Sequence, residues 1–247
     1  MNNFHCVRVI LIVAALSVVV LPTVAADRPE RAVILKTFAK VAVTAGSGPT
    51  WSRTRRWPDA IRIAIDGDYT TQDATKVAHT RDLIRRVIQR PMPIFFSPLS
   101  PAEISRTHVV VAFREPAMIS TAKATLQRTF EREQSPTVYV DENDGCVLVL
   151  HPDGERQLAF AMVLVATGSD DAARHHCISL RLTQAMGLPG SYPEASGSVF
   201  DSSQRNKHTL LDRAILWLLY HPEMNAGLDR EQALKRIKEL LVREGLN

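Results

Sequence analysis

The side chains best suited to metal or nucleophilic chemistry form a short run, His175-His176-Cys177, which follows Asp170 and Asp171. Imidazole, thiolate and carboxylate groups are the usual protein ligands of transition metals. The run is predicted to be helical, however, and adjacent residues on a helix point about 100° apart, so the two histidines cannot easily face one ion. Aspartates at this place more simply stabilise the positive N-terminal end of the helix. The pattern therefore favours a helix start over a metal site.

Two other polar clusters have less specific chemistry. The turn at 141–144, Asp-Glu-Asn-Asp, offers oxygen ligands for calcium, but its spacing does not match an EF-hand loop, and a solvated turn is favoured. Arg53, Arg55 and Arg56 stand beside two tryptophans, which is a composition that suits an anionic polymer or a lipid headgroup. A solvated basic loop is the favoured interpretation. The chain has neither a G-x-S-x-G elbow nor a phosphate-binding glycine loop.

The most informative segment runs from Cys177 to Pro189, with the sequence CISLRLTQAMGLP. Its spacing resembles the zinc-peptidase helix H-E-x-x-H-x-x-G-x-x-H when Gly187 is placed on the motif glycine. The first ligand, the catalytic glutamate, the second ligand and the third ligand then fall on Leu180, Arg181, Gln184 and Gly190. None of these four residues supplies a zinc-ligating group or a general base. We therefore predict no catalytic, cofactor-binding or metal-binding residue in this helix, and no cofactor for the protein.

Matches further along the chain extend this pattern. The segment resembles a family of exported bacterial proteins known as domain of unknown function 2927. Its members show a cysteine before the helix, a Thr-Gln-x-x-Gly-Leu-Pro run, a Ser-x-Phe and an apolar helix that ends in Leu-Tyr. The matching residues here are Cys177, Thr183 to Pro189, Ser198-Val199-Phe200, and Leu211-Asp212 through Leu219-Tyr220, followed by Pro222 and Gly227. Arg56-Trp57 upstream is compatible, so the resemblance spans roughly Trp51 to Gly227.

The resemblance implies a zincin-like fold without a demonstrated activity. Where members of the family carry two glutamates before the Thr-Gln, this chain has Leu180-Arg181. The surface that the resemblance singles out is the former substrate cleft, near Arg181, Gln184 and Ser198. A partner peptide can add a strand to an exposed sheet edge at such a place.

Three interpretations of function follow. The first is a non-catalytic binding or structural module whose partner is a periplasmic protein or peptide. The second is a hydrolase that acts on peptide or cell-wall material with unidentified residues or a metal bound outside the helix. The third is an unrelated α+β fold with a chance match, in which the helix that contains Cys177 lacks the cleft strand that zincins place beside it.

The N-terminus is typical of a secretory signal peptide. Arg8 precedes the apolar run Val9–Leu21, and Val24 and Ala26 suit cleavage after Ala26. The alternative is a membrane anchor, although the apolar run is short for a span, which needs about 20 residues. Cleavage leaves residues 27–247 in the periplasm or secreted, with membrane contact only through an uncleaved signal.

The cysteines support the same compartment. Cys6 leaves with the predicted signal peptide, and Cys146 and Cys177 remain. An even pair in an exported protein suggests one disulfide bond. The alternative is two buried thiols.

Composition limits the class of protein. The chain has 247 residues, of which 45% are hydrophobic and 23% charged, and these values fit a compact globular domain. The formal net charge of +4 is too small to indicate a nucleic-acid partner, and export makes such a partner improbable.

Hydrophobic periodicity predicts the elements that position these residues. Strands are expected at 61–65, 108–113, 137–140, 146–150 and 160–165, with at most a short edge strand within 91–101. Helices are expected at 72–90, from 116, and at 172–186, 208–220 and 229–244, and residues 33–43 fit a strand or a short helix. We therefore expect one α+β domain, with a mixed sheet backed by helices and a helical C-terminal third that packs under the sheet.

The predicted organisation of the chain has four parts. Residues 1–26 are the signal peptide and residues 27–50 an N-terminal extension. Residues 51–227 form the degenerate zincin-like domain. Residues 228–247 form a C-terminal amphipathic helix packed on the same domain.

Overall fold

A computed structural model describes residues 29–43, 52–133, 138–141, 145–154, 156–192, 198–201 and 208–245. Within them the strands are β1 (Ile63–Gly67), β2 (Ile94–Phe96), β3 (Val109–Arg114), β4 (Val138–Asp141), β5 (Cys146–Asp153) and β6 (Gln157–Ala166). The helices are α1 (Arg31–Val41), α2 (Thr71–Ile88), α3 (Pro101–Ile104), α4 (Pro116–Glu133), α5 (Asp171–Gln184), α6 (Leu210–Tyr220) and α7 (Arg230–Arg243). The predicted signal peptide lies outside the described residues.

The described strands form one six-stranded sheet in the order β2-β1-β3-β6-β5-β4. Strands β2, β1, β3 and β6 run parallel, whereas β5 is antiparallel to β6 and β4 is antiparallel to β5. Val111 of β3 pairs with Ile65 on one side and with Val163 on the other. Paired residues point to the same face of a sheet, so this β-branched row lies in the main core.

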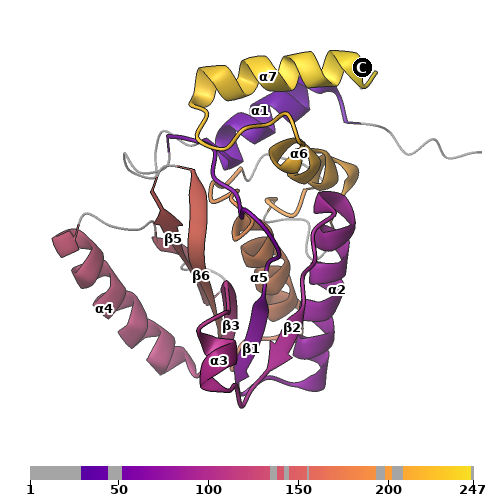
Figure 1. The fold of residues 1–247 in the computed structure, drawn as a ribbon. Helices are drawn as coiled ribbons and strands as arrows, with labels where there is room; N and C mark the ends of the chain where they lie inside the picture. The colour runs from indigo at the N-terminus through magenta and orange to yellow at the C-terminus, as the bar shows by residue number, and fades with distance from the viewer. Residues whose placement is uncertain are drawn as a thin grey trace, which may run out of the picture.

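The two faces of the sheet are covered differently (Figure 1). On one face, α2 and α5 contribute to a large apolar core together with the strands. A capping box formed by Thr70 and Asp73 starts α2, and Val77, Ile84 and Ile88 form its buried stripe. On the other face, α4 contacts β4, β5 and β6, and Ile119 packs there in a smaller cluster. The sheet is therefore backed by helices on both faces, although unequally.

A group of three helices lies beyond the sheet. Helix α1 contacts α6 and α7, and α6 also contacts α2 (Figure 1). Phe38 and Val41 of α1 are buried in the same core as Ile237 and Leu240 of α7. Helix α6 thus packs on α1 and α2 and helix α7 on α1, whereas α5, the first helix of the C-terminal third, packs on β5 and β6 of the sheet, as expected. Residues from the expected N-terminal extension belong to the domain core.

The predicted α+β class, with a mixed sheet and a helical C-terminal stretch, is confirmed. Each predicted strand and helix is present with shifts of a few residues at its ends. The four-residue helix α3, which starts at Pro101 with a capping box from Ser100 and Glu103, was not predicted. None of the helices in the described residues is long and apolar enough to cross a membrane.

Candidate functional site

The aspartates before the histidine pair stabilise the start of α5. The Asp170 carboxylate accepts a hydrogen bond from the backbone N–H of Ala173 at 3.0 Å and thereby caps the helix. Asp171 pairs with Arg174 at 2.5 Å, and Arg174 also pairs with the buried Asp73 of α2 at 3.0 Å. This network joins α2 to α5, which confirms the interpretation of these acids as a helix start.

The histidines lie in different surroundings. His176 and Cys177 are buried, whereas His175 lines a shallow groove beside Lys76 and His79 of α2. Within the part of the chain that the structure describes, no three His, Cys, Asp or Glu side chains come together as a group able to hold a metal ion. The side chains of the acidic turn 141–144 lie outside that part.

The positions that match the zinc-peptidase motif serve a structural purpose. Arg181 donates from Nη1 to Oε1 of Gln184 at 2.8 Å, and Gln184 donates from Nε2 to the carbonyl of Gly190 at 3.1 Å. Leu180 packs in the core. Arg181 is 2% exposed and Gln184 is 1% exposed. These two side chains therefore stabilise the loop that follows the helix and do not line a solvent-accessible cleft.

Gly187 is required where α5 ends. Its φ of +103° is in the region that favours glycine, and a Cβ atom there would lie 2.1 Å from the carbonyl oxygen of Arg55. The last carbonyls of the helix region are also satisfied by side chains. Trp57 donates from Nε1 to Ala185 O, and the Tyr220 hydroxyl donates to Met186 O, each at 2.9 Å. Gly187 thus allows the end of α5 to pack closely against the segment that contains Arg55 and Trp57 and against Tyr220 of α6.

Ser198 lies in a separate buried network. It is 0% exposed, and its hydroxyl donates to Oδ1 of Asp212 at 2.5 Å. The same carboxylate accepts from the backbone N–H groups of Val199, at 3.0 Å to Oδ2, and Thr209, at 2.7 Å. Burial raises the pKa of Asp212, and these hydrogen bonds oppose that rise. The structure therefore brings Arg181 and Gln184 together but gives Ser198 a different partner, and it places all three in the interior.

The edges of the sheet in the described residues are β2 and β4, whereas the motif helix α5 contacts the interior strands β5 and β6. Strand β4 pairs with Cys146 to Val149 of β5, on the side away from β6. Cys177 is buried in α5, which contacts β5 and β6. The side chain of Cys146 lies outside the described residues, so the disulfide between Cys146 and Cys177 remains a prediction.

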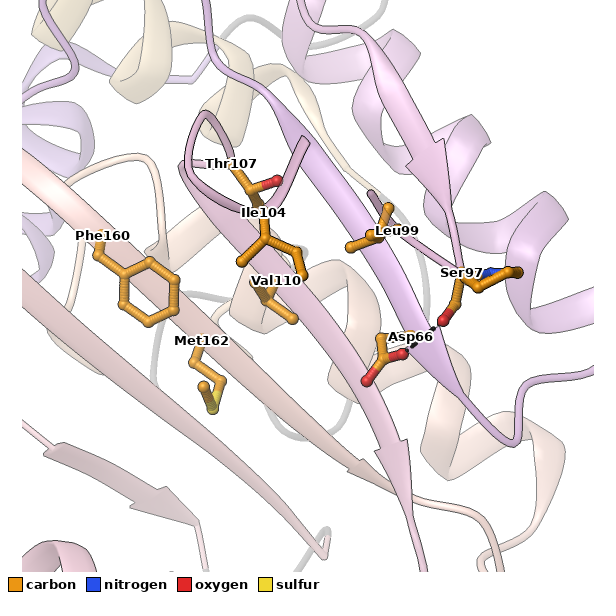
Figure 2. Close-up of a pocket in the computed structure, with 9 residues that line it drawn as sticks. Asp66, Ser97, Leu99, Ile104, Thr107, Val110, Phe160 and Met162 are labelled. Carbon is orange, nitrogen blue, oxygen red and sulfur yellow. Dashed lines mark hydrogen bonds between the residues drawn. The ribbon is translucent and has the colours of Figure 1, made fainter. Parts of the chain in front are cut away.

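A pocket of about 480 Å³ opens on the sheet face opposite α2 and α5. Its floor is apolar and consists of Val110 from β3 and of Phe160 and Met162 from β6, as Figure 2 shows. Ile104 of α3 forms part of the wall and is 59% exposed. Val110, Phe160 and Met162 are half-buried, so part of this apolar surface is accessible.

A charged pair stands at one end of this pocket. Asp66, the fourth residue of β1, pairs with Arg114, the last residue of β3, and accepts a hydrogen bond from the Ser97 hydroxyl at 2.7 Å. The hydrogen bond from Arg114, followed by that from Ser97, holds the pKa of Asp66 below its ordinary value. A Cβ atom at Gly67 would collide with the Arg114 side chain, so glycine leaves room for the pair. Ligands of open α/β sheets often bind at this carboxyl edge of the strands.

A comparison with protein-family models matches residues 31–239 to the model described as "Protein of unknown function (DUF2927)". The chain belongs to the DUF2927 family. This confirms the resemblance inferred from the motif helix, and it extends the match beyond Trp51 and Gly227 into α1 and α7. No curated protein and no solved structure matches the chain, so the zincin-like fold remains a prediction.

The basic and aromatic segment of this DUF2927 protein is mostly internal. Trp57 is 1% exposed, Arg55 is buried, and Trp51 lies outside the described residues. Arg56 donates from Nη1 to the carbonyls of Leu219 and His221, at 3.4 and 3.2 Å. These carbonyls lie at the C-terminal end of α6, where a positive side chain stabilises the helix. The segment expected to be a solvated loop is therefore largely structural, and Arg53 lines a pocket.

Proposed function

We propose that this DUF2927 protein is a non-catalytic binding module that acts in the periplasm, where the sheet-face pocket holds an apolar group of a partner protein or peptide. The observation that carries the proposal is the uncovered apolar floor formed by Val110, Phe160 and Met162. A concave, mainly apolar pocket with few polar groups is the usual form of a ligand site, and its volume is within the normal range of about 300–1,000 Å³.

The polar groups of the pocket favour an apolar ligand because each already has a protein partner. Ser97 donates to Asp66, and Asp66 is also paired with Arg114. The Thr107 hydroxyl donates to the carbonyl of Glu103 at 2.8 Å. The ligand is therefore expected to be recognised by its shape and by apolar contacts. The polar side chains of the pocket already have hydrogen-bond partners in the protein, so they gain little by bonding to a ligand.

We further propose that the scaffold is a degenerate zincin-like one. Two features support this. The motif helix α5 directly follows the parallel strand β6, and the antiparallel strand β5 lies next to β6 in contact with the same helix. Arg181, at the position of the catalytic glutamate, bonds to Gln184, at the second ligand position, and Gln184 bonds to the carbonyl of Gly190, which favours a binding role over peptide hydrolysis.

An apolar fluorescent probe tests the binding role. We expect N-phenyl-1-naphthylamine to bind the protein, and Met162→Arg to weaken that binding by about tenfold or more, because a guanidinium on the floor fills and charges the pocket. Ile104→Asp, at an exposed wall position, is expected to act in the same direction without affecting folding. Val242→Arg, on the exposed face of α7, is the matched control.

Two outcomes would contradict the proposal. One is equal probe binding by Ile104→Asp, Met162→Arg and the unchanged protein. The other is one equivalent of a transition metal that survives dialysis of the protein purified without a metal-binding tag, because that result would favour a hydrolase.

Export also predicts a disulfide bond between Cys146 and Cys177. Strand β5 begins at Cys146, and the helix that contains Cys177 packs on β5, so the two positions belong to contacting elements. We expect the mature protein from an oxidising compartment to gain no mass on alkylation of the denatured chain until it has been reduced. Two alkylated cysteines before reduction would show that both are thiols.

A further inference from the structure

A second pocket, of about 510 Å³, is lined by residues other than those of the apolar pocket. It lies where three segments of the chain meet, one at Arg53, one at Arg156 and Gln157, and one from Asn225 to Gln232. Backbone hydrogen bonds join these segments. Thr54 N–H donates to Leu228 O at 2.8 Å, and Gly227 N–H donates to Thr54 O at 2.7 Å. Arg56 N–H donates to Arg156 O at 3.4 Å. Main-chain hydrogen bonds therefore connect the three segments that form this pocket.

Gly227 orients two guanidinium groups in this pocket. Its φ is +90°, and a Cβ atom at this position would lie 2.8 Å from Cγ of Arg156, so the stem of Arg156 rests directly on the glycine. On the other side, Arg53 donates from Nη1 to the carbonyl of Gly227 at 3.0 Å. One glycine thus brings together two arginines that are far apart in the sequence.

One of the two guanidinium groups in the pocket has no counter-ion among the residues that the structure describes. Arg53 and Arg156 line the pocket, and none of its lining residues within the described ranges is an aspartate or a glutamate. The side chain of Arg156 makes no hydrogen bond or ion pair with any residue in the described ranges. The nearby Asp229 is engaged as the cap of α7, where its carboxylate accepts from the Gln232 N–H at 2.9 Å. An exposed guanidinium without a counter-ion, whose stem rests against the wall of a pocket, can bind carboxylate or phosphate.

The remaining wall is rich in carboxamides. Gln157, Asn225 and Gln232 line the same pocket, and each carboxamide has both donor and acceptor atoms. Such groups suit the hydroxyl and amide groups of a polar ligand rather than an apolar chain.

We propose that this pocket binds an oxyanion, a carboxylate or a phosphate ester, on a ligand that also presents hydroxyl groups. Arg156 and Arg53 contact the oxyanion, and the carboxamides contact the neutral polar groups. This site is separate from the apolar pocket, and its test does not depend on the binding role proposed for that pocket.

The test is a titration of the mature protein, followed by NMR or calorimetry, with four probes. These are glucuronate, glucose 6-phosphate, inorganic phosphate and neutral glucose. We expect at least one of the first two to bind more tightly than glucose. Glucuronate and glucose 6-phosphate distinguish a carboxylate site from a phosphate site, and inorganic phosphate shows how much the sugar contributes.

The variants test the arginines directly. Arg156→Gln, at an exposed position, is expected to keep the fold and to weaken anion binding by about tenfold or more, because a charge-assisted hydrogen bond contributes about 1.5–3 kcal/mol. Gly227→Ala is expected to displace Arg156 and reduce binding similarly. Arg86→Gln, an exposed arginine on α2, makes the same charge change and is expected to have no effect. Equal binding of glucose and both charged sugars, unchanged affinity in Arg156→Gln, or no binding of any anion at millimolar concentration would each overturn the proposal.

Discussion

Replacing Asp212 by alanine is expected to lower the free energy of unfolding by about 3–5 kcal/mol, the range found when a buried charge network loses one member. The carboxylate is fully buried and accepts hydrogen bonds from the Ser198 hydroxyl and from the backbone N–H groups of Val199 and Thr209. Removing it leaves these donors buried without an acceptor, and each unsatisfied group costs about 1–3 kcal/mol. Denaturant unfolding followed by circular dichroism measures the loss.

The chain contains a matched control for this prediction. Asp229 is also the acidic member of a capping box, at the start of α7, but it is only partly buried. Asp229→Ala is expected to lower the free energy of unfolding by about 1 kcal/mol, as is typical of helix caps. Similar losses in the two variants would show that Asp212 acts only as a cap and that its burial contributes little.

The stability of the protein is expected to fall by about 3 kcal/mol between pH 7 and pH 4 because of His208, on the basis of 1.36 kcal/mol per pKa unit. Burial lowers the pKa of His208 to about 4, and Lys76, Arg213 and His79 add to this effect. The unfolded chain binds the proton near the ordinary histidine value of about 6.5. Stability from this group is therefore complete above pH 6.5 and is lost as the pH falls toward 4.

The hydrogen bond of His208 to Thr183 shows which ring nitrogen carries the proton when the ring is neutral. The Thr183 hydroxyl donates to the carbonyl of Ser179 at 2.7 Å, so it accepts a hydrogen bond from Nε2 of His208 at 2.6 Å. This assigns the proton of the neutral ring to Nε2. His208→Gln retains a donor and removes the titration, so the difference in unfolding free energy between the two proteins at each pH isolates this group. A difference in unfolding free energy that stays constant from pH 7 to pH 4 would contradict the lowered pKa of His208.

Much of the fold was predictable because local patterns and tertiary structure agree. The apolar residues of 61–65, 108–113 and 160–165 became the parallel strands β1, β3 and β6. Asp170 and Gly187 mark the two ends of the α5 region, with the capping bond and the positive φ that their residue types favour. These signals depend on neighbours within a few residues. The location of α6 and α7 depends on which distant apolar faces they bury, and of the C-terminal helices α5 is the one that packs on the sheet as expected.

The candidate sites were less predictable because they join residues that are distant in the sequence. Arg114 pairs with Asp66 across 48 positions of the chain, and no local motif signals this contact. No sequence motif singles out Arg156, and its contact with Gly227 is evident only in the three-dimensional structure. The motif residues Arg181 and Gln184 were expected at a cleft because of their place in the peptidase pattern. Their burial follows from the loop at Gly190 that folds back over the helix end, which spacing alone does not reveal.

The contact between α1 and α7 joins the first and the last of the described elements, at Arg31–Val41 and Arg230–Arg243, so it can form only after nearly the whole chain has been made. Until α6 and α7 are present, Phe38 and Val41 lack the apolar partners that these two helices supply. A nascent chain with such an exposed stripe is a substrate for holding chaperones and a site of early proteolysis. Truncated chains that lack α7 should therefore be degraded in the cell even when the sheet, whose strands all precede α5, has been made completely.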